Sequence, residues 1–431
     1  MRSGAGGKSI SVPLRILDKC YVCASVKGLR VCNSCASRIY CSRECQKKDW
    51  KEHKPWCSAT VQINLKVFYP LIAYMMEFMR CVTSQFHNVL PRPHPAFNHK
   101  IIRAPLPGVR KSTESDSPIH HTVTLGARHT ITDLSGWWKA GLRAHGDAGC
   151  LKLFHHCGRE HSVYKIIIAT TLALLAEVYS TYHVLTSEPP FVIEGNRPRF
   201  RLEYGKSPIA DFGICKGKVR GKTHRVQTWT YYDPATETRT TPLDPENHYW
   251  IYFKALSGEE LVLDCCSYSF GMEATVDASP CLETLPPMMC IPGSSRVPAY
   301  LRSSRDTGGG DKLPYTLVEE KRFSVMQNTE LQKAIATEVD PRGLAKDSDE
   351  VKIVRAFMDE VLGEACTDYD VEAMLWWRMN GAGILREVLT GRSWLEWEKP
   401  MMHQKSLFDC GENLYDITTK GVKDISIFYQ N

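Results

Sequence analysis

The sequence contains no apolar run long enough to cross a membrane. The longest, Ile166–Ala176, is much shorter than the roughly 20 residues that a membrane-spanning helix needs, and charged residues flank it on both sides. Residues 1–17 also lack the continuous apolar segment of a secretory signal peptide. We therefore expect a protein without membrane contact, located in the nucleus, the cytoplasm or both.

The sequence is also poor in net charge and has no cysteine framework that spans the chain. A formal net charge of +6 over 431 residues is too small to indicate nucleic acid as the main ligand. Of the 17 cysteines, the ten beyond residue 57 are scattered, which is typical of a reducing compartment. An apolar content of 43% is sufficient for a sizeable core, and the length indicates two or three domains.

Four pairs of metal-binding side chains lie between residues 20 and 57. The pairs are Cys20 with Cys23, Cys32 with Cys35, Cys41 with Cys45, and His53 with Cys57. Their short gaps let both members of a pair reach the same tetrahedral zinc ion, so eight ligands predict two closed Zn2+ sites. A disulfide framework is the alternative. It explains the pattern less well, because seven cysteines cannot all pair and disulfides give no role to His53.

The order of these pairs, and the segment YCSRECQKKDWKEHKPWC that ends them, resembles a MYND-type zinc finger. The resemblance implies a cross-brace, in which the first and third pairs share one zinc ion and the second and fourth share the other. The implied ligand sets are Cys20, Cys23, Cys41 and Cys45 for one ion, and Cys32, Cys35, His53 and Cys57 for the other. Crossed pairs would tie together a unit that is too small for an apolar core. Seven thiolates and two zinc ions would lower the net charge of the chain to about +3.

The third and fourth pairs enclose a predicted helix. Residues 42–54 are strong helix formers without proline or glycine, and Gln46 and Trp50 share one face of that helix. In MYND fingers that bind proline-containing peptides, the matching residues line the groove, so the resemblance implies that Gln46 and Trp50 bind a peptide. A flat indole suits a rigid, extended, proline-rich ligand. Alternatively, Trp50 packs against the zinc sites. Nine basic and three acidic residues between 19 and 57 predict a locally basic surface, with solvated helix faces, acidic peptide flanks or DNA phosphate as alternatives.

A larger α+β body is expected after the finger, with a helical first part, an antiparallel β middle and a helical C-terminus. Apolar stretches predict buried helices over Leu71–Gln85 and Ser162–Leu185, and alternating stretches between Gly and Pro turns predict the strands. The whole chain resembles fungal proteins that carry one MYND finger beside a long region of unassigned role. The predicted segments are a disordered tail at 1–17, the finger at 18–59, an α+β domain with antiparallel hairpins at 60–283, a loop or linker at 284–320, and a mainly helical region at 321–431.

One stretch of the body has a spacing that suggests catalysis. Residues 247–268 predict two strands joined by a turn near Gly258, which would place His248 opposite Asp264. This spacing resembles the His–Asp half of transglutaminase-like and papain-type folds, which implies a thiol nucleophile near a helix start. Cys157, ahead of the helix expected from Ser162, is the candidate. The alternatives are an inactive relic of such a fold and an ordinary hairpin.

A second resemblance to an enzyme is weaker. SET-type lysine methyltransferases can contain MYND fingers, and the GEEL sequence at 258–261 resembles one of their motifs, but residues 249–251 lack the expected cysteine and Pro-Asn. We therefore favour a zinc-binding adaptor, for example one acting in transcription, that docks partner proteins and is not an enzyme. A thiol enzyme that uses Cys157, His248 and Asp264 is the first alternative, and a methyltransferase is the second.

Overall fold

The computed structural model describes most of the chain, with gaps. The described residues are 7–10, 12–14, 16–57, 60–86, 94–105, 119–128, 146–183, 199–221, 226–266, 270, 274–290, 295–304, 315–336, 348–397 and 402–403. Within these ranges, no helix has both the length and the apolar character needed to span a membrane.

The N-terminal part of the chain consists of a short hairpin and one helix. β2 (Arg30–Val31) pairs antiparallel with β3 (Ile39–Tyr40), and α1 (Arg43–Cys57) follows directly. The helix predicted over residues 42–54 is confirmed, and it continues to Cys57. The buried cluster of this part consists of cysteines and Tyr40, without an aliphatic centre. A unit with so little apolar area depends on bound metal to fold.

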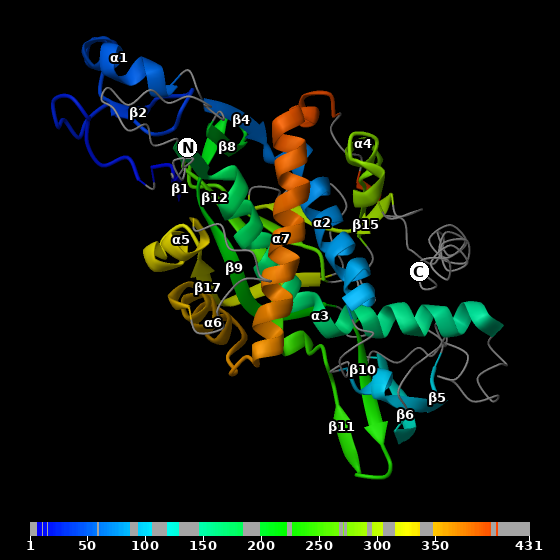
Figure 1. Ribbon diagram of the computed structural model, residues 1–431. Coiled ribbons are helices and arrows are strands. Elements are labelled where there is room, and N and C mark those ends of the chain that lie inside the picture. Colours follow the sequence, from blue (N-terminus) through cyan, green and yellow to red (C-terminus); the bar gives the residue numbers. More distant parts are fainter. Residues whose placement is uncertain are drawn as a thin grey trace.

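A mixed sheet of seven strands forms the centre of the body (Figure 1). Its strands are β4 (Thr60–Asn64), β8 (Arg199–Tyr204), β9 (Ser207–Gly221), β12 (His248–Ala255), β13 (Glu260–Asp264), β16 (Tyr300–Ser303) and β17 (Tyr315–Ser324). The strand order is β16-β13-β12-β9-β8-β4, and β17 also pairs with β9. β4 and β8 are parallel, whereas the other pairs have the antiparallel arrangement predicted for the middle of the chain.

Glycine allows β17 to approach β9 closely. A Cβ atom at Gly213 would lie 2.0 Å from the carbonyl oxygen of Phe323, and a Cβ atom at Gly217 would lie 2.1 Å from that of Val318. Real Cβ atoms do not come so close to a backbone oxygen, so no other residue fits at these two positions without moving a strand.

Three long helices pack together and enclose the main core with the sheet. They are α2 (Leu65–Phe86), α3 (Gly146–Val178) and α7 (Asp368–Gly391). The buried helices predicted over Leu71–Gln85 and Ser162–Leu185 are present, but both begin earlier than predicted and α3 ends at Val178. The N-terminal end of α3 extends away from the central sheet (Figure 1).

The main core unites parts of the body that the sequence suggested were separate. Its buried side chains run from Ile63 to Trp397, so the described parts of residues 60–283 and 321–397 share one core. The predicted helical C-terminal region is present as α5 (Thr329–Ala336), α6 (Asp349–Leu362) and α7. The Ser348 side chain caps α6, and Thr367 forms a capping box with Asp370 at the start of α7. Residues 404–431 lie outside the described residues.

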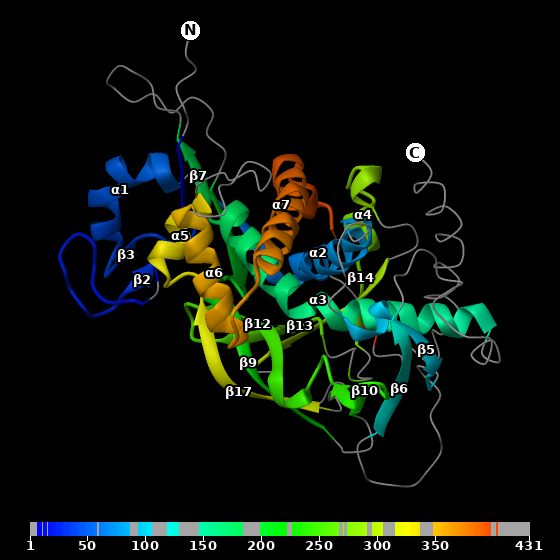
Figure 2. The ribbon, with the colours of Figure 1, turned by 60° about the horizontal axis from the view of Figure 1, so that its bottom comes forward.

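A smaller sheet lies beside the N-terminal half of α3 (Figure 2). Its strands are β5 (His99–Arg103), β6 (Ile119–Arg128), β10 (Gln227–Asp233) and β11 (Thr238–Thr240). They lie in the order β11-β10-β6-β5, and β6 and β10 are parallel. Leu153 and Cys157 of α3 complete the core of this sheet.

Two segments that were predicted to lack regular structure contain strands. β1 (Gly7–Ile10) pairs with β7 (Ser180–His183), so the prediction of a disordered tail at residues 1–17 is wrong for these four residues. The predicted linker at 284–320 contains β15 (Arg296–Pro298), β16 and the start of β17. Strands this short show too little alternation to predict. The other short elements are β14 (Thr275–Asp277), β18 (Met402–His403), α4 (Ser279–Leu282) and 3-10 turns at Pro95–Asn98, Pro245–Asn247, Pro287–Met289 and Ser393–Leu395.

Paired strands join the finger, residues 20–57, to the body on both sides. β1 precedes the finger and pairs with β7, whereas β4 follows it and pairs with β8. Between them, the Gln62 side-chain amide donates a hydrogen bond to the Asn33 carbonyl oxygen, and the Leu14 backbone N–H donates to the Ala36 carbonyl oxygen at 3.2 Å. The finger is thus anchored at both ends, by β1 on one side and by β4 on the other (Figure 1).

Candidate metal centre and finger helix

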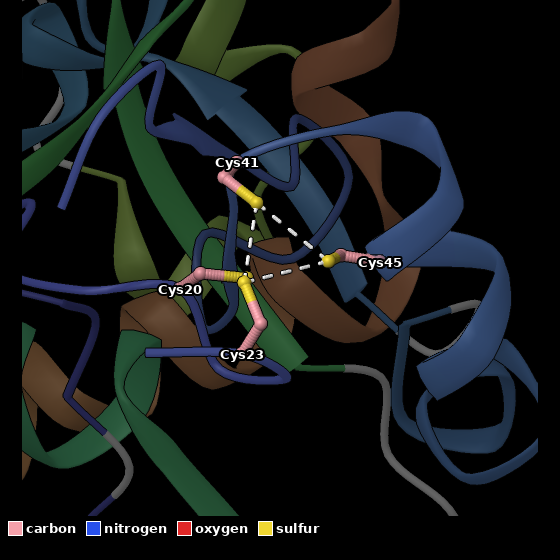
Figure 3. A group of neighbouring side chains, drawn as sticks. All are labelled: Cys20, Cys23, Cys41 and Cys45. Carbon is pink, nitrogen blue, oxygen red and sulfur yellow. Dashed lines mark hydrogen bonds between the residues drawn. The ribbon is translucent and has the colours of Figure 1, made fainter. Parts of the chain in front are cut away.

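The first group of metal-binding side chains gathers four sulfurs. Cys20 and Cys23 lie ahead of the β2–β3 hairpin, Cys41 follows β3, and Cys45 lies in the first turn of α1 (Figure 3). All four sulfurs lie within 4.8 Å of one another, with Sγ–Sγ distances of 3.4 Å from Cys23 to Cys41 and 3.6 Å from Cys41 to Cys45. Thiolates about 2.3 Å from a central zinc ion have sulfur separations of this size.

The second group contains Cys32, Cys35, His53 and Cys57, all buried. The Cys35 sulfur lies 3.0 Å from His53 Nε2, and the Cys32 and Cys57 sulfurs are 3.5 Å apart. The two predicted ligand sets are therefore confirmed, and so is the cross-brace between them.

A chain of hydrogen bonds orients the histidine ligand. Its Nε2 atom faces the sulfurs, while its Nδ1 atom lies 2.7 Å from the Tyr40 hydroxyl oxygen. Tyr40 in turn donates its own proton to the Asp49 carboxylate at 2.5 Å. A histidine that binds zinc through Nε2 carries its proton on Nδ1 and donates it to an outer partner, so this arrangement fits a metal ligand. Burial and the contact with Asp49 raise the pKa of Tyr40, so its hydroxyl stays protonated.

One thiol in each group has a lowered pKa, whereas hydrogen bonds with neighbouring thiols and burial raise the pKa of Cys35, Cys41, Cys45 and Cys57. The hydrogen bond with Cys35 is the largest influence on Cys32 and lowers its pKa to about 5. At Cys20, burial acts to raise the pKa, but hydrogen bonds from backbone groups outweigh it and lower the pKa to about 6. Each site therefore holds a thiol that ionises at neutral pH, and the thiolate is the form that binds zinc.

The donor sets decide which metal fits and what it does. Four sulfurs, or three sulfurs and one imidazole, in tetrahedral spacing suit Zn2+. Four protein ligands leave no position for water or substrate, so two zinc ions held here stabilise the fold of the finger.

The helix α1 turns one face to the metal sites and the other to solvent. Asp49 and the ligands Cys45 and His53 are buried, Gln46 is half-buried, and Trp50 is 42% exposed. The Trp50 ring meets the His53 ring edge-on, with centroids 5.8 Å apart. Trp50 therefore packs against a metal ligand, as the alternative predicted, and also presents indole surface to solvent. Its binding of a peptide stays a prediction.

The His–Asp pair of the body is present, but the expected thiol is not beside it. In the β12–β13 hairpin, His248 Nε2 lies 2.9 Å from an Asp264 carboxylate oxygen, and both side chains are buried. The Tyr315 hydroxyl also donates to Asp264, at 3.2 Å. The His248 ring otherwise contacts Trp250 and Phe270.

Cys157 lies in the interior of α3, because this helix begins at Gly146 and not near Ser162 as predicted. Its sulfur lies 3.3 Å from the Tyr231 hydroxyl in the core of the smaller sheet, and no hydrogen bond among the described residues joins it to His248. Burial raises the pKa of the Cys157 thiol well above its usual value. A buried, protonated thiol is a poor nucleophile. The GEEL sequence at 258–261 forms the turn and the start of β13.

Next to Cys157 lies a buried polar cluster that the sequence reasoning missed. Tyr231 donates to the Glu160 carboxylate at 2.5 Å, and His94 Nε2 lies 3.3 Å from the same oxygen. Because His94 Nδ1 accepts a hydrogen bond from the Ala96 backbone, Nε2 carries the proton and donates, which does not suit a metal ligand. His156 lies one helical turn before Glu160, and this i,i+4 spacing was the available signal.

Comparison with known proteins gives results for the finger alone. Residues 20–57 match the family model of the MYND finger. Egl nine homolog 1 of Mus musculus is 38% identical over 58 residues, which are 13% of this chain and 14% of that protein. Egl nine homolog 1 of Homo sapiens is 39% identical over 57 residues, 13% of each. The alignments thus span only a small part of these relatives, and no solved structure gives a significant match.

Proposed function

Because residues 20–57 form a MYND-type zinc finger, we propose that this protein is an adaptor whose finger helix binds a proline-containing partner peptide through Gln46 and Trp50. MYND fingers are protein-interaction modules, which supports the coarser part of the proposal. The observation that carries the finer part is the 42% exposure of Trp50 beside the half-buried Gln46.

The exposure of Trp50 is unusual in this chain. Among the described tryptophans, Trp50 alone is exposed, whereas Trp229, Trp250, Trp377 and Trp394 are at least 95% buried. Leaving an indole in water forgoes about 25 cal/mol for each Å2 of apolar surface that could be buried. An exposed indole held firmly against a zinc ligand is therefore suited to bury that surface against a partner.

The chemistry of the two side chains suits an extended peptide with prolines. A proline ring lies flat on an indole, and the polyproline conformation is already ordered before binding, so little entropy is lost. Proline has no backbone N–H, and its carbonyl oxygens can accept hydrogen bonds from the Gln46 amide. The two zinc ions serve this function indirectly, because they hold the helix in place.

Fluorescence anisotropy with a labelled proline-rich peptide of twelve residues tests the proposal on the full chain. Trp50→Ala should weaken binding by about thirtyfold, since a buried interface tryptophan contributes about 2 kcal/mol or more. Leu395→Ala, which removes another exposed apolar side chain far along the sequence, should not change binding. Native mass spectrometry should find two zinc ions in all three proteins. Equal peptide affinity of the Trp50→Ala and unsubstituted proteins would refute the role of this residue.

The zinc-binding thiols also bear on where the protein acts in the cell. Thiols that bind zinc persist in the reducing nucleus and cytoplasm, so we propose either or both as the site of action. Imaging of a fluorescently tagged full chain tests this, and accumulation in the secretory pathway would contradict it.

A further inference from the structure

The Trp50 face of helix α1 carries an excess of basic side chains. With 3.6 residues per turn, Arg43, Lys47 and Lys54 lie within about 60° of Trp50 around the helix axis, and all three are exposed. Gln46 borders the same face at about 40° from Trp50. The three basic side chains therefore lie on one side of Trp50 around the helix axis, and Gln46 lies on the other side.

The acidic residues of α1 lie elsewhere. Asp49 is buried and accepts the proton of Tyr40, so it does not contribute to the surface. Glu52 lies about 160° from Trp50, and Glu44 lies about 120° away. The Ser42 hydroxyl, the Glu44 backbone N–H, Lys47 and Arg43 lower the pKa of Glu44, so its carboxylate offsets part of the basic charge at one end of the face. The remainder of the face stays basic.

Resting on the proposed function, we infer that the partner peptide carries acidic residues beside its prolines, and that Arg43 and Lys47 contact them. An exposed ion pair changes affinity only about two- to fivefold, so two or three pairs add roughly tenfold and mainly select among peptides. The Trp50 indole supplies the attraction common to all proline-containing ligands, and the basic side chains supply the discrimination.

A peptide fits this face better than a nucleic acid. Specific DNA interfaces bury about 600 Å2 or more of protein even for single modules, and their affinity comes from many phosphate contacts. The face has three basic side chains beside one indole and one amide, which matches a short extended chain. DNA remains as an outcome to be tested.

The experiment uses the full chain with both zinc ions and three labelled peptides of the same proline content. Their flanking positions are glutamate, glutamine or lysine. We expect the glutamate peptide to bind about tenfold more tightly than the glutamine peptide in 50 mM salt, and the lysine peptide to bind most weakly. Raising the salt to 500 mM should bring the three affinities together.

Substitutions at different positions of α1 test whether the peptide preference depends on the charge of the Trp50 face or on the net charge of the protein. The double variant R43E/K47E should reverse the peptide preference, and R43Q/K47Q should abolish it. Lys48→Glu, on an exposed position about 160° from Trp50, should change each affinity by less than about twofold when measured in 150 mM salt, because the helix diameter of about 10–12 Å exceeds the Debye length of about 8 Å at that salt concentration. A zinc count of two by native mass spectrometry, required of every variant, verifies the fold.

The outcomes distinguish the inference from the function on which it rests. If all three peptides bind equally and Trp50→Ala weakens each of them, the inference is wrong and the proposed function stands. If none of them binds, the proposed function fails and the inference fails with it. If a twelve-nucleotide single strand displaces the glutamate peptide at a lower concentration than the unlabelled peptide does, the basic face serves nucleic acid and the inference is overturned.

Discussion

Replacing Tyr40 by phenylalanine tests whether the hydrogen bonds around His53 support zinc binding. The substitution removes only the hydroxyl oxygen that accepts from His53 Nδ1 at 2.7 Å and donates to the Asp49 carboxylate at 2.5 Å. Both partners are buried, and a buried polar group that loses its partner costs about 1–3 kcal/mol. Changes in this outer layer typically reduce metal affinity 10- to 100-fold, or about 1.4–2.8 kcal/mol.

Competition with a chromogenic chelator measures this loss. We expect the first zinc ion to leave Tyr40→Phe at a chelator concentration 10- to 100-fold lower than it leaves the unsubstituted protein. Tyr21→Phe is the matched control, because the Tyr21 ring is exposed and lies under the Arg38 guanidinium, 3.5 Å from it. It should release zinc as the unsubstituted protein does. If Tyr40→Phe and Tyr21→Phe release zinc at the same chelator concentration, the hydrogen bonds do not support the ligand and our argument is wrong.

Three further predictions concern the body. Gly213→Ala should lower the free energy of unfolding by at least about 2 kcal/mol in urea denaturation, because its Cβ would meet the Phe323 carbonyl oxygen, whereas Gly383→Ala, which has space, should be neutral or stabilising. Burial acts to raise the pKa of Glu160, but His156 and His94 outweigh it and lower the pKa to about 2. The ionised Glu160 therefore stabilises the fold above its unfolded pKa of about 4.5, and this stabilisation is lost as the pH falls toward 2. The free energy of unfolding of Glu160→Gln, measured by urea denaturation, should therefore fall by about 2 kcal/mol less between pH 5 and pH 3 than that of the unsubstituted protein. Cys157 should resist iodoacetamide at pH 8 until the protein unfolds, as read by mass spectrometry of its peptide.

Each of these has a contradicting result. Equal stability of the Gly213→Ala and Gly383→Ala proteins would show that β17 can move away from β9 at no cost. An unchanged acid dependence in Glu160→Gln would mean that other groups, such as the zinc ligands, account for all of it. Modification of Cys157 in the native protein at the rate of a free cysteine would show that its thiol is accessible and reactive, contrary to our prediction.

The finger could be predicted from the sequence because its chemistry is local. The ligand pairs have gaps of two or three residues, and both members of a pair must reach one ion whatever the rest of the chain does. The exposure of Trp50 and the hydrogen bonds of Tyr40 could not be predicted in this way. They depend on how the hairpin packs on α1, which the spacing of the ligands does not specify.

The body was harder to predict because its decisive contacts join distant segments. The start of α3 was placed too late because residues 146–161 contain three glycines and seven polar or charged residues, which interrupt the apolar pattern of a buried helix. That error moved Cys157 to a helix start in the prediction, whereas it lies in a helix interior. The hairpin that pairs His248 with Asp264 was predictable, since its turn and alternation are contiguous in the sequence. The pairing of β1 with β7 leaves no such signal.

The anchoring of the finger between β1 and β4 has a mechanical consequence. A peptide bound to α1 would have a fixed orientation relative to the body, because no flexible linker separates the finger from the body. Any second contact between this partner and the body would then form at a high effective concentration. The same attachment couples the body to the metal sites. Without zinc, the folded finger would no longer hold β1 and β4 in place, and these strands pair with β7 and β8 of the body, so we expect zinc removal to lower the free energy of unfolding of the body as well.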